Sequence, residues 1–277
     1  ECSAMSKKIL GNNIDIHGGG VDLLFPHHEN EIAQSECRSS STFSNFWVHN
    51  NLINFDNQKM SKSLGNIIKG RDFIKKYNAE ILKFIILSVH YRSILNFNKK
   101  IINQTIINLI KIYSSLELSE KINQSNLDEL KSLGYEEYFK NCQKKADDFI
   151  NNDFNTPGLF SVFFDMVRYF NSISINKKLT PELKYFSIKF QDFFQKYGSI
   201  LGLFHESKNK FLNNLNLFLL KSKRVKIDDI EKKIEERNKA RKSKDYHNSD
   251  RIREELKVLG IEIKDNKDGK TSWSVKV

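Results

Sequence analysis

The sequence predicts a mostly α-helical protein with α/β parts, because three regions of different texture follow one another along its 277 residues. In residues 1–70, glycines alternate with short apolar runs, as is typical of α/β structure. Apolar residues then recur at three- and four-residue steps through residues 71–223, the pattern of amphipathic helices packed in a bundle. Residues 224–277 are rich in charge and indicate a small α+β module. We expect each region to be a separate domain.

The first region is expected to hold strands around a helix. The residues NIDIHGGG, at 13–20, predict a strand that enters a glycine-rich turn. The segment PHHENEIAQSEC, at 26–37, predicts a helix that Pro26 opens. The segment FWVHNNLINF, at 46–55, has the β-branched and aromatic residues of one or two strands.

The other two regions differ in what their helices carry. Residues 154–170 and 183–204 are crowded with phenylalanines at helical spacing, which predicts a packed core rather than a surface for stacking RNA bases. Residues 228–260 predict one long charged helix that breaks near His247 and ends at Gly260. Two short strands are expected after it, around a hairpin turn formed by Lys267, Asp268 and Gly269.

The chain is basic, with a formal net charge of +11 from 45 lysine and arginine residues against 34 acidic ones. This surplus predicts an acidic partner, most simply nucleic acid. Part of the lysine content has another explanation, because the chain is also rich in asparagine and isoleucine, as an AT-rich genome would produce. The three cysteines form no paired framework, and no apolar run is long enough to span a membrane. We therefore expect a cytoplasmic protein without a signal peptide.

A candidate metal site combines Cys2 with the helix after Pro26. His27 and Glu31 are four residues apart and so share one helical face, whereas His28 is expected to point away from it. Together with the thiol of Cys2, they would supply three ligands for a zinc ion. The spacing alone leaves a second interpretation open, because buried His–Glu pairs are commonly structural.

Two further stretches carry residues suited to a nucleotide. The glycines at 18–20 would let a ligand approach the backbone closely, and Asp22 could accept hydrogen bonds from ribose hydroxyls. A plain tight turn would also use such glycines. The segment FDNQKMSKSLGN, at 55–66, indicates either a mobile loop that closes on phosphate oxygens or an ordinary exposed loop of a basic protein.

Three segments in this order and spacing, ECSAM, DIHGGGVDLLFPHHENEIAQSE and KMSKSLGN, closely resemble the cysteinyl-tRNA synthetases, a family of class I aminoacyl-tRNA synthetases. The resemblance extends over essentially the whole chain. It implies that residues 1–70 are the C-terminal remainder of a Rossmann-like catalytic domain with its KMSKS loop. Residues 71–223 would then contact the tRNA stem and form a helical bundle, and residues 224–277 would bind the anticodon. It also implies a piece of a longer protein, inactive alone, without the half that carries the HIGH-type motif.

The same resemblance implies roles for individual residues. Lys62, assisted by Lys59, contacts the ATP phosphates while the adenylate forms, with Mg2+ accompanying ATP. The implied ATP site comprises Lys59, Ser61, Lys62, Ser63, Gly20 and Asp22. Cys2, His27 and Glu31 match three zinc ligands of the family, whose zinc binds the thiolate of L-cysteine. The fourth ligand belongs to the missing segment, so we expect one zinc in the full-length enzyme and weak or no zinc binding here.

In the tail, Arg241, Lys242 and Lys244 precede Tyr246 on the predicted helix, and Asp250 follows one turn later. Cations beside an aromatic ring suit single-stranded RNA, whose phosphates meet the cations while an unstacked base lies on the ring. In this interpretation Asp250 accepts a hydrogen bond from the edge of a guanine. The alternative is a solvated helix with Tyr246 half buried, and the resemblance favours RNA binding. Many members of the family carry tryptophan in place of Tyr246.

The resemblance thus implies ATP-dependent ligation of L-cysteine to tRNA(Cys) by a cytoplasmic monomer that does not bind membranes. Two alternatives stay open. A cysteine ligase of thiol biosynthesis shares the zinc site and the KMSKS loop, but it would not need roughly two hundred basic, mostly helical residues. A non-catalytic RNA-binding module would not need the two lysines of the loop or the three candidate zinc ligands.

Overall fold

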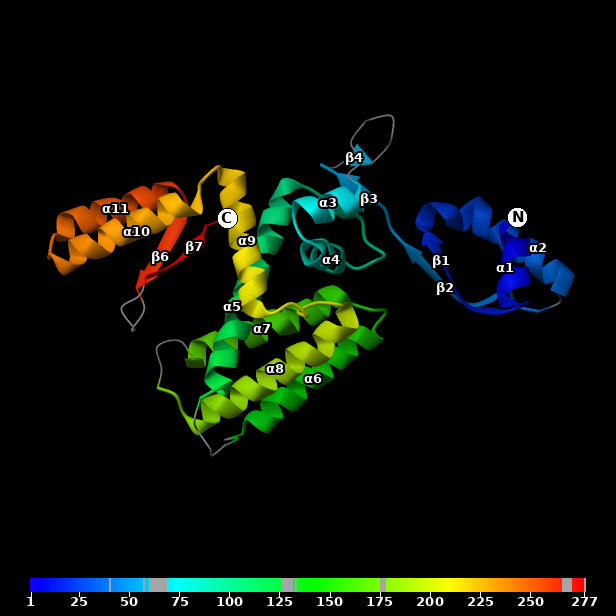
Figure 1. The fold of residues 1–277 in the computed structure, drawn as a ribbon. Coiled ribbons are helices and arrows are strands. Elements are labelled where there is room, and N and C mark those ends of the chain that lie inside the picture. The colour runs from blue at the N-terminus through cyan, green and yellow to red at the C-terminus, as the bar shows by residue number, and fades with distance from the viewer. Residues whose placement is uncertain are drawn as a thin grey trace. The chain divides into compact units, whose positions relative to one another are not determined.

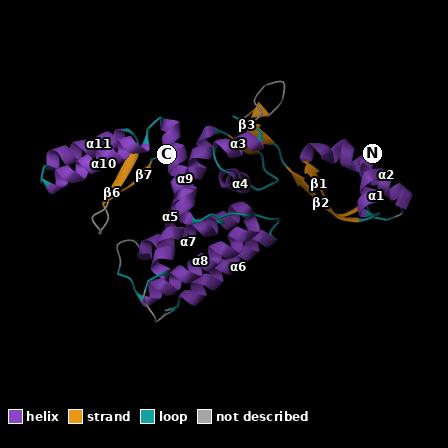
Figure 2. Ribbon diagram, in the orientation of Figure 1, coloured by secondary structure: helices purple, strands orange, loops and turns teal. Residues whose placement is uncertain are grey.

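The computed structural model describes residues 1–39, 41–56, 58–59, 69–125, 132, 134–174, 178–265 and 271–276 (Figure 1). The chain divides into two compact units. The first comprises residues 1–102 and 141–162, and the second comprises residues 103–140 and 163–277. The structure is mostly helical with three small sheets, as the sequence predicts (Figure 2). Within the described residues, no helix combines the length and apolarity needed to cross a membrane.

The first unit opens with a βαβ arrangement. Its elements are α1 (Cys2–Leu10), β1 (Ile14–Gly20), α2 (Glu29–Ser39) and β2 (Ser44–Asn50). The two strands are parallel, in a register that pairs His17 with Trp47 and Gly20 with Asn50. The helix predicted from Pro26 begins at Glu29 instead. A short 3₁₀ turn and a π-helical turn precede it, namely η1 (Val21–Leu23) and η2 (Leu24–His28).

The three glycines do not form the predicted turn, because they are the last residues of β1 and none has a positive φ. Close approach explains them better. A Cβ atom on Gly19 would lie 2.7 Å from Cε1 of His28, and one on Gly20 would lie 2.4 Å from Oδ1 of Asp22. Side chains from the following turns therefore occupy the space that a larger residue in β1 would need.

A second sheet in the same unit contains the start of the KMSKS segment. Its strands are β3 (Ile53–Phe55), β4 (Gln58–Lys59) and β5 (Leu95–Phe97), with β3 in the centre, antiparallel to β4 and parallel to β5. Two helices follow β4, α3 (Gly70–Lys76) and α4 (Ala79–Leu87). They bury Phe73, Ile81 and Phe84. Two strands over residues 46–55 are thus confirmed.

The turn around Asp153 is fixed within the first unit by a polar cluster. The Tyr91 hydroxyl donates to Asp153 Oδ1 at 2.6 Å, and Arg92 Nε donates to Asp153 Oδ2 at 2.6 Å. These bonds hold the pKa of the Asp153 carboxyl below its usual value, with the Arg92 bond contributing most. The loop before β5 is thereby tied to the turn between two long helices.

Five long helices follow β5: α5 (Lys99–Asn123), α6 (Tyr135–Asn151), α7 (Thr156–Ser174), α8 (Pro181–Leu201) and α9 (Lys208–Lys223). The core of the second unit is aromatic. Phe170 and Phe190 stack with ring centroids 4.6 Å apart, and Phe163 and Phe194 stack at 4.7 Å. All four rings are buried. The prediction that these phenylalanines form a core is therefore confirmed.

The charged helix of the tail is broken as predicted, and the break, at residues 243–245, comes just before His247. Its elements are α10 (Ile227–Lys242), α11 (Tyr246–Val258), β6 (Ile261–Asp265) and β7 (Thr271–Val275). Lys244 adopts a φ of 61°, and the Asp245 side chain accepts a hydrogen bond from the Asn248 N–H at 3.1 Å, which begins α11. The predicted hairpin strands are confirmed as an antiparallel pair. The predicted turn at 267–269 lies outside the described residues.

Gly198, inside α8, tests the packing of this second unit. A Cβ atom there would lie 2.9 Å from the Leu203 carbonyl oxygen and 2.8 Å from Cδ2 of Phe204. Gly198→Ala is expected to lower the free energy of unfolding by about 1 kcal/mol, because overpacking outweighs the gain in helix propensity. Thermal unfolding followed by circular dichroism measures the loss. The neighbouring exposed Ser199→Ala is the control, and a Gly198→Ala protein as stable as that control would contradict the expectation.

Candidate functional site

The buried carboxylate of Glu31 lies at the centre of the candidate metal site. Glu31 is in the first turn of α2 and is 4% exposed. Its Oε1 lies 3.7 Å from His27 Nε2, and its Oε2 lies 3.0 Å from His17 Nε2. Despite that short distance, Oε2 accepts no hydrogen bond. An oxygen of this kind is costly to bury unless a cation faces it.

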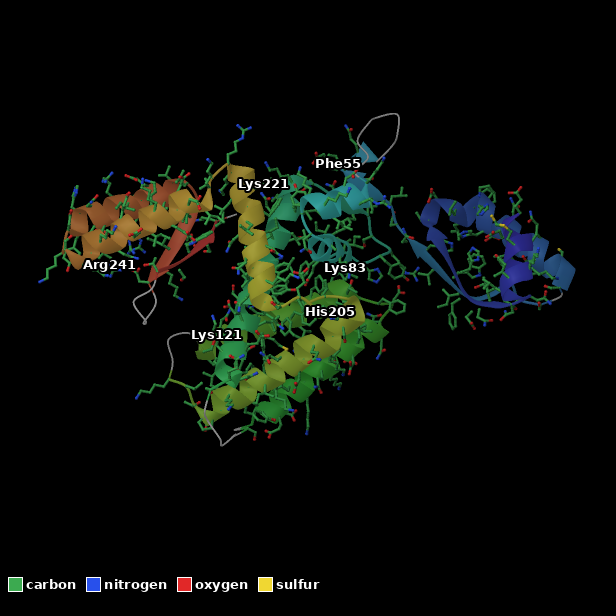
Figure 3. The ribbon with its side chains drawn as sticks, viewed as in Figure 1. Phe55, Lys83, Lys121, His205, Lys221 and Arg241 are labelled. Atoms are coloured by element: carbon green, nitrogen blue, oxygen red, sulfur yellow. The ribbon has the colours of Figure 1, made fainter. Side chains whose placement is uncertain are left out.

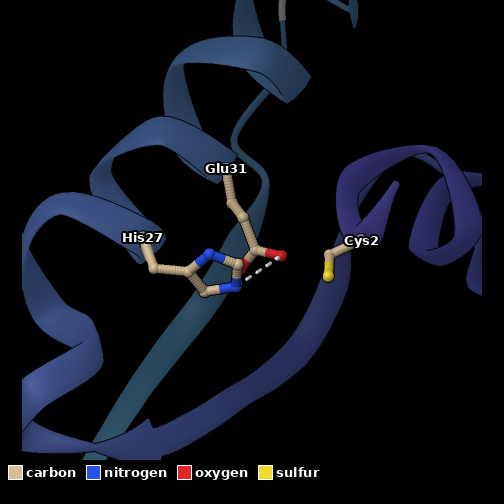
Figure 4. Close-up of side chains that lie close together, drawn as sticks. All are labelled: Cys2, His27 and Glu31. Atoms are coloured by element: carbon tan, nitrogen blue, oxygen red, sulfur yellow. Dashed lines mark ion pairs between the residues drawn. The ribbon is translucent and has the colours of Figure 1, made fainter.

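The three residues predicted from the sequence come together at this carboxylate (Figure 4). Ligand atoms of Cys2, His27 and Glu31 all lie within 4.8 Å of one another. Cys2 comes from the first turn of α1, and the hydroxyl of Ser3 donates to Gln34 Oε1 at 3.0 Å, which links α1 to α2. One thiol, one imidazole and one carboxylate fit the ligand preferences of Zn2+. Metal binding itself stays a prediction.

A second possible donor set shares the same carboxylate. Atoms of His17, His28 and Glu31 also lie within 4.8 Å of one another. The sequence analysis missed His17, whose place depends on how β1 lies against η2 and α2. His28 was predicted to point away from the site. That expectation is wrong, because a ring nitrogen of His28 lies within 4.8 Å of the ligand atoms of His17 and Glu31, and the His17 and His28 rings are 4.9 Å apart.

His28 belongs to a buried group of rings. It is 3% exposed, and its Nδ1 shares a hydrogen bond with Nε2 of His49, 2.8 Å away. Burial lowers the pKa of His28 from its ordinary value, and the neighbouring imidazoles of His17 and His49 lower it further. The ring is therefore neutral at neutral pH. Trp47 lies beside these rings, 4.6 Å from His17 and stacked on His49.

The candidate ATP residues lie in two places within the first unit. Gly20 ends β1 and Asp22 lies in η1, with an exposed carboxylate that turns back over Gly20. The carboxyl ends of parallel strands are the usual edge for nucleotide binding. Lys59 ends β4, opposite Asn54 of β3. The other predicted members, Ser61, Lys62 and Ser63, lie outside the described residues.

The candidate RNA-binding residues of the tail are on two helices, not on one as predicted. Tyr246 begins α11 and is 63% exposed, so the half-buried alternative does not describe it. Asp250 is exposed one turn later. Arg241 lies in the last turn of α10 and forms an ion pair with Asp265. The break at 243–245 separates the two helices.

Asp265 also binds a second arginine that the sequence analysis missed. Buried Arg237 donates to both carboxylate oxygens of Asp265, at 2.8 and 2.9 Å. These bonds hold the pKa of the Asp265 carboxyl well below its usual range. In the sequence, the four-residue spacing of Arg237 and Arg241 was the available indication that the two arginines share one face of α10. Only the pairing of β6 with β7 brings Asp265 to them.

Two family models match the chain. Residues 1–107 match the catalytic domain of class I (C) tRNA synthetases, and residues 147–205 match the DALR domain. Among solved structures, a Mycobacterium tuberculosis methionyl-tRNA synthetase in complex with methionyl-adenylate aligns with a TM-score of 0.46 and 13% identity, covering 63% of this chain and 38% of that chain. A likeness this low carries no argument.

The curated relatives are more informative. The chain is 40% identical over 276 residues to a cysteine--tRNA ligase of Bdellovibrio bacteriovorus, covering 99% of this chain and 57% of the relative. It is 39% identical over 271 residues to a cysteine--tRNA ligase of Streptococcus thermophilus, covering 97% of this chain and 52% of the relative. The chain thus spans about half the length of these relatives. With both domain models matched, it belongs to the cysteinyl-tRNA synthetase family of class I aminoacyl-tRNA synthetases.

Proposed function

We propose that this chain takes part in the ATP-dependent ligation of L-cysteine to tRNA(Cys). The observation that carries the proposal is the convergence of Cys2 and His27 on the buried carboxylate of Glu31. The relatives that bear the name cysteine--tRNA ligase align with nearly the whole chain, which supports the same activity. Because the chain spans about half of their length, we expect the 277 residues alone to show only background cysteine activation.

Zinc is the metal that this donor set suits, held by Cys2, His27 and Glu31. When bound, it would recognise the thiolate of L-cysteine, for which a serine hydroxyl is a poor substitute. The chain's own residues prepare the site. Glu31 keeps an oxygen without a hydrogen bond, and His17 stands next to that oxygen. His28, whose pKa burial lowers, adds no positive charge to oppose a cation.

The ATP site is proposed from the loop that follows β4 and from the end of β1. Lys59 and Lys62, with Ser61 and Ser63, would face the phosphates, whose charge Mg2+ would share. The lack of a side chain at Gly20 lets Asp22 turn back over the strand, and the exposed Asp22 carboxylate would accept hydrogen bonds from the ribose. Cations placed where charge develops lower the barrier to adenylate formation.

For the tRNA, we propose that the tail binds the anticodon. One base would stack on Tyr246, the edge of that base would donate a hydrogen bond to Asp250, and a phosphate would contact Arg241. The exposure of Tyr246 supports stacking. A cysteine ligase of thiol biosynthesis and a non-catalytic RNA-binding module remain the alternatives. The DALR domain match favours a tRNA substrate. A monomer in the cytoplasm is also proposed.

Cobalt substitution tests the metal site, because Co2+ bound to a thiolate absorbs strongly in the near ultraviolet. Saturating Co2+ is expected to give that band with the wild-type chain, and Cys2→Ser should abolish it. Binding should be weak, since only three protein ligands are present. Cys37→Ser, which removes another exposed cysteine, should keep the band. If the wild-type chain binds Co2+ without that band, and His17→Ala rather than Cys2→Ser abolishes the binding, the second donor set is the correct one.

The phosphate role of the loop is tested with Lys62→Ala in the whole enzyme. Cysteine-dependent ATP–diphosphate exchange should fall about a hundredfold or more, a loss of about 3 kcal/mol that is typical of removing a transition-state contact. Lys75→Ala, at an exposed lysine of α3, is the control and should be unaffected. Normal exchange in the Lys62 variant would show that the loop has been misassigned.

Anticodon reading is tested with Tyr246→Ala, again in the whole enzyme. A stacked base is worth about 1–3 kcal/mol, so the KM for tRNA should rise roughly tenfold or more, and Tyr246→Trp should keep it low. Exchange without tRNA should not change. Aminoacylation kinetics with wild-type and anticodon-substituted tRNA measure the effect. An unchanged KM and anticodon preference would mean that the ring does not touch RNA.

A further inference from the structure

We propose that the junction between α9 and α10 is a binding surface for the sugar–phosphate backbone of the tRNA, a proposal that rests on the function above. We call it the junction cluster and define it as Lys221, Lys223, Arg224 and Lys226. Residues 207–227 contain six cations and no carboxylate. The positive charge is therefore concentrated locally rather than interspersed with acids, as it is on most helices of this chain.

The cluster is exposed, and Asp228 and Asp229, in the first turn of α10, are the carboxylates that follow it in the chain. All four side chains are exposed, and among the described residues none of them forms a hydrogen bond or an ion pair. Other lysines of the same unit do have partners, such as Lys121 with Glu117 and Lys189 with Asp192. Free cations close together attract phosphates most strongly, since each contact releases a counterion.

The helix dipole explains only part of the cluster. Cations in the last turn of a helix are favourable, and Lys221 and Lys223 lie in the last turn of α9. Arg224 and Lys226 come after the helix has ended. Their presence needs another reason.

Arg224 also occupies a backbone conformation that favours glycine. Its φ is 58° and its ψ is 32°, and its N–H donates to the carbonyls of Leu220 and Lys221. At the equivalent end of α8 the chain has Gly202, with φ 65° and ψ 33°. An arginine kept in a left-handed conformation costs stability, so an outlier of this kind points to a use for its guanidinium.

The cluster and Tyr246 lie at opposite ends of one helix. A Cβ atom on Gly260 would lie 2.6 Å from Nζ of Lys223, so that ammonium group adjoins the end of α11. The 13 residues of α11 span about 20 Å at roughly 1.5 Å per residue. If a base stacks on Tyr246, the cluster lies about six nucleotides from that base along the RNA strand, at roughly 3.4 Å per nucleotide. We infer that the cluster binds phosphates of the stem next to the stacked base. Lys221 of the cluster lies in the last turn of α9 (Figure 3).

The decisive experiment compares two double variants of the 277-residue chain that lose the same charge. Arg224→Gln with Lys226→Gln should weaken binding of tRNA(Cys) about tenfold at low salt. It should also flatten the slope of log K against log salt by roughly 0.7–0.9 per lost contact. Lys121→Gln with Lys189→Gln, at paired lysines, is the control and should change neither. The loss should be equal for tRNA with a substituted anticodon, because phosphates carry no sequence.

A single variant separates function from folding. Arg224→Gly should raise the melting temperature or leave it unchanged, because glycine is relaxed at this φ, and should still weaken tRNA binding severalfold. If both properties are unchanged, or if the two double variants behave alike, the junction cluster does not bind tRNA.

The other outcomes are equally clear. Loss of binding with Tyr246→Ala, without any difference between the two double variants, overturns the cluster but leaves the proposed function standing. Absence of salt-dependent tRNA binding by the wild-type chain overturns both. If the cluster variant loses binding to vesicles containing phosphatidylserine and keeps its affinity for tRNA, the surface binds anionic membranes and the proposal fails.

Discussion

The carboxylate of Glu31 is the constraint around which the first unit is organised. A carboxylate side chain that is only 4% exposed is costly to bury unless donors or a cation surround it. Cys2 from α1, His27 from η2 and His17 from β1 supply the surrounding groups. The absence of a side chain at Gly19 belongs to the same arrangement, because His28 fills the space beside the strand. The side chains of Cys2, His17 and His27 thus meet at one buried carboxylate.

In the second unit, buried residues pack the helices together, and exposed residues at the helix ends are the candidates for binding a partner. Stacked rings such as Phe163 with Phe194 pack the helices together and are themselves buried. Recognition is therefore expected at helix ends, where side chains are exposed. Tyr246 begins one helix and the junction cluster ends another. A rigid helix between two contact points fixes their separation, which suits a partner as stiff as a nucleic-acid stem.

Local patterns predicted the elements well because their causes are local. Helical spacing of apolar residues, the cap at Asp245 and the strand residues around Trp273 act over a few positions. The failures also have local causes. Phe25 has an extended backbone, with φ −133° and ψ 132°, so α2 begins later than predicted, and His28 faces the site. The φ of Lys244 put Arg241 and Tyr246 on separate helices. Neither departure has a strong sequence signal.

By itself, the sequence determined the family and the identity of the candidate metal ligands, because their types and spacing are a property of the chain. Only the tertiary structure decided which side chains meet. His17 reaches Glu31 because β1 lies beside α2, and Asp265 reaches Arg237 because β6 folds back against α10. The same is true of Lys223 and Gly260, which lie 37 residues apart in the chain. Contacts of this kind depend on how elements pack, and packing is set by the whole chain rather than by any stretch of it.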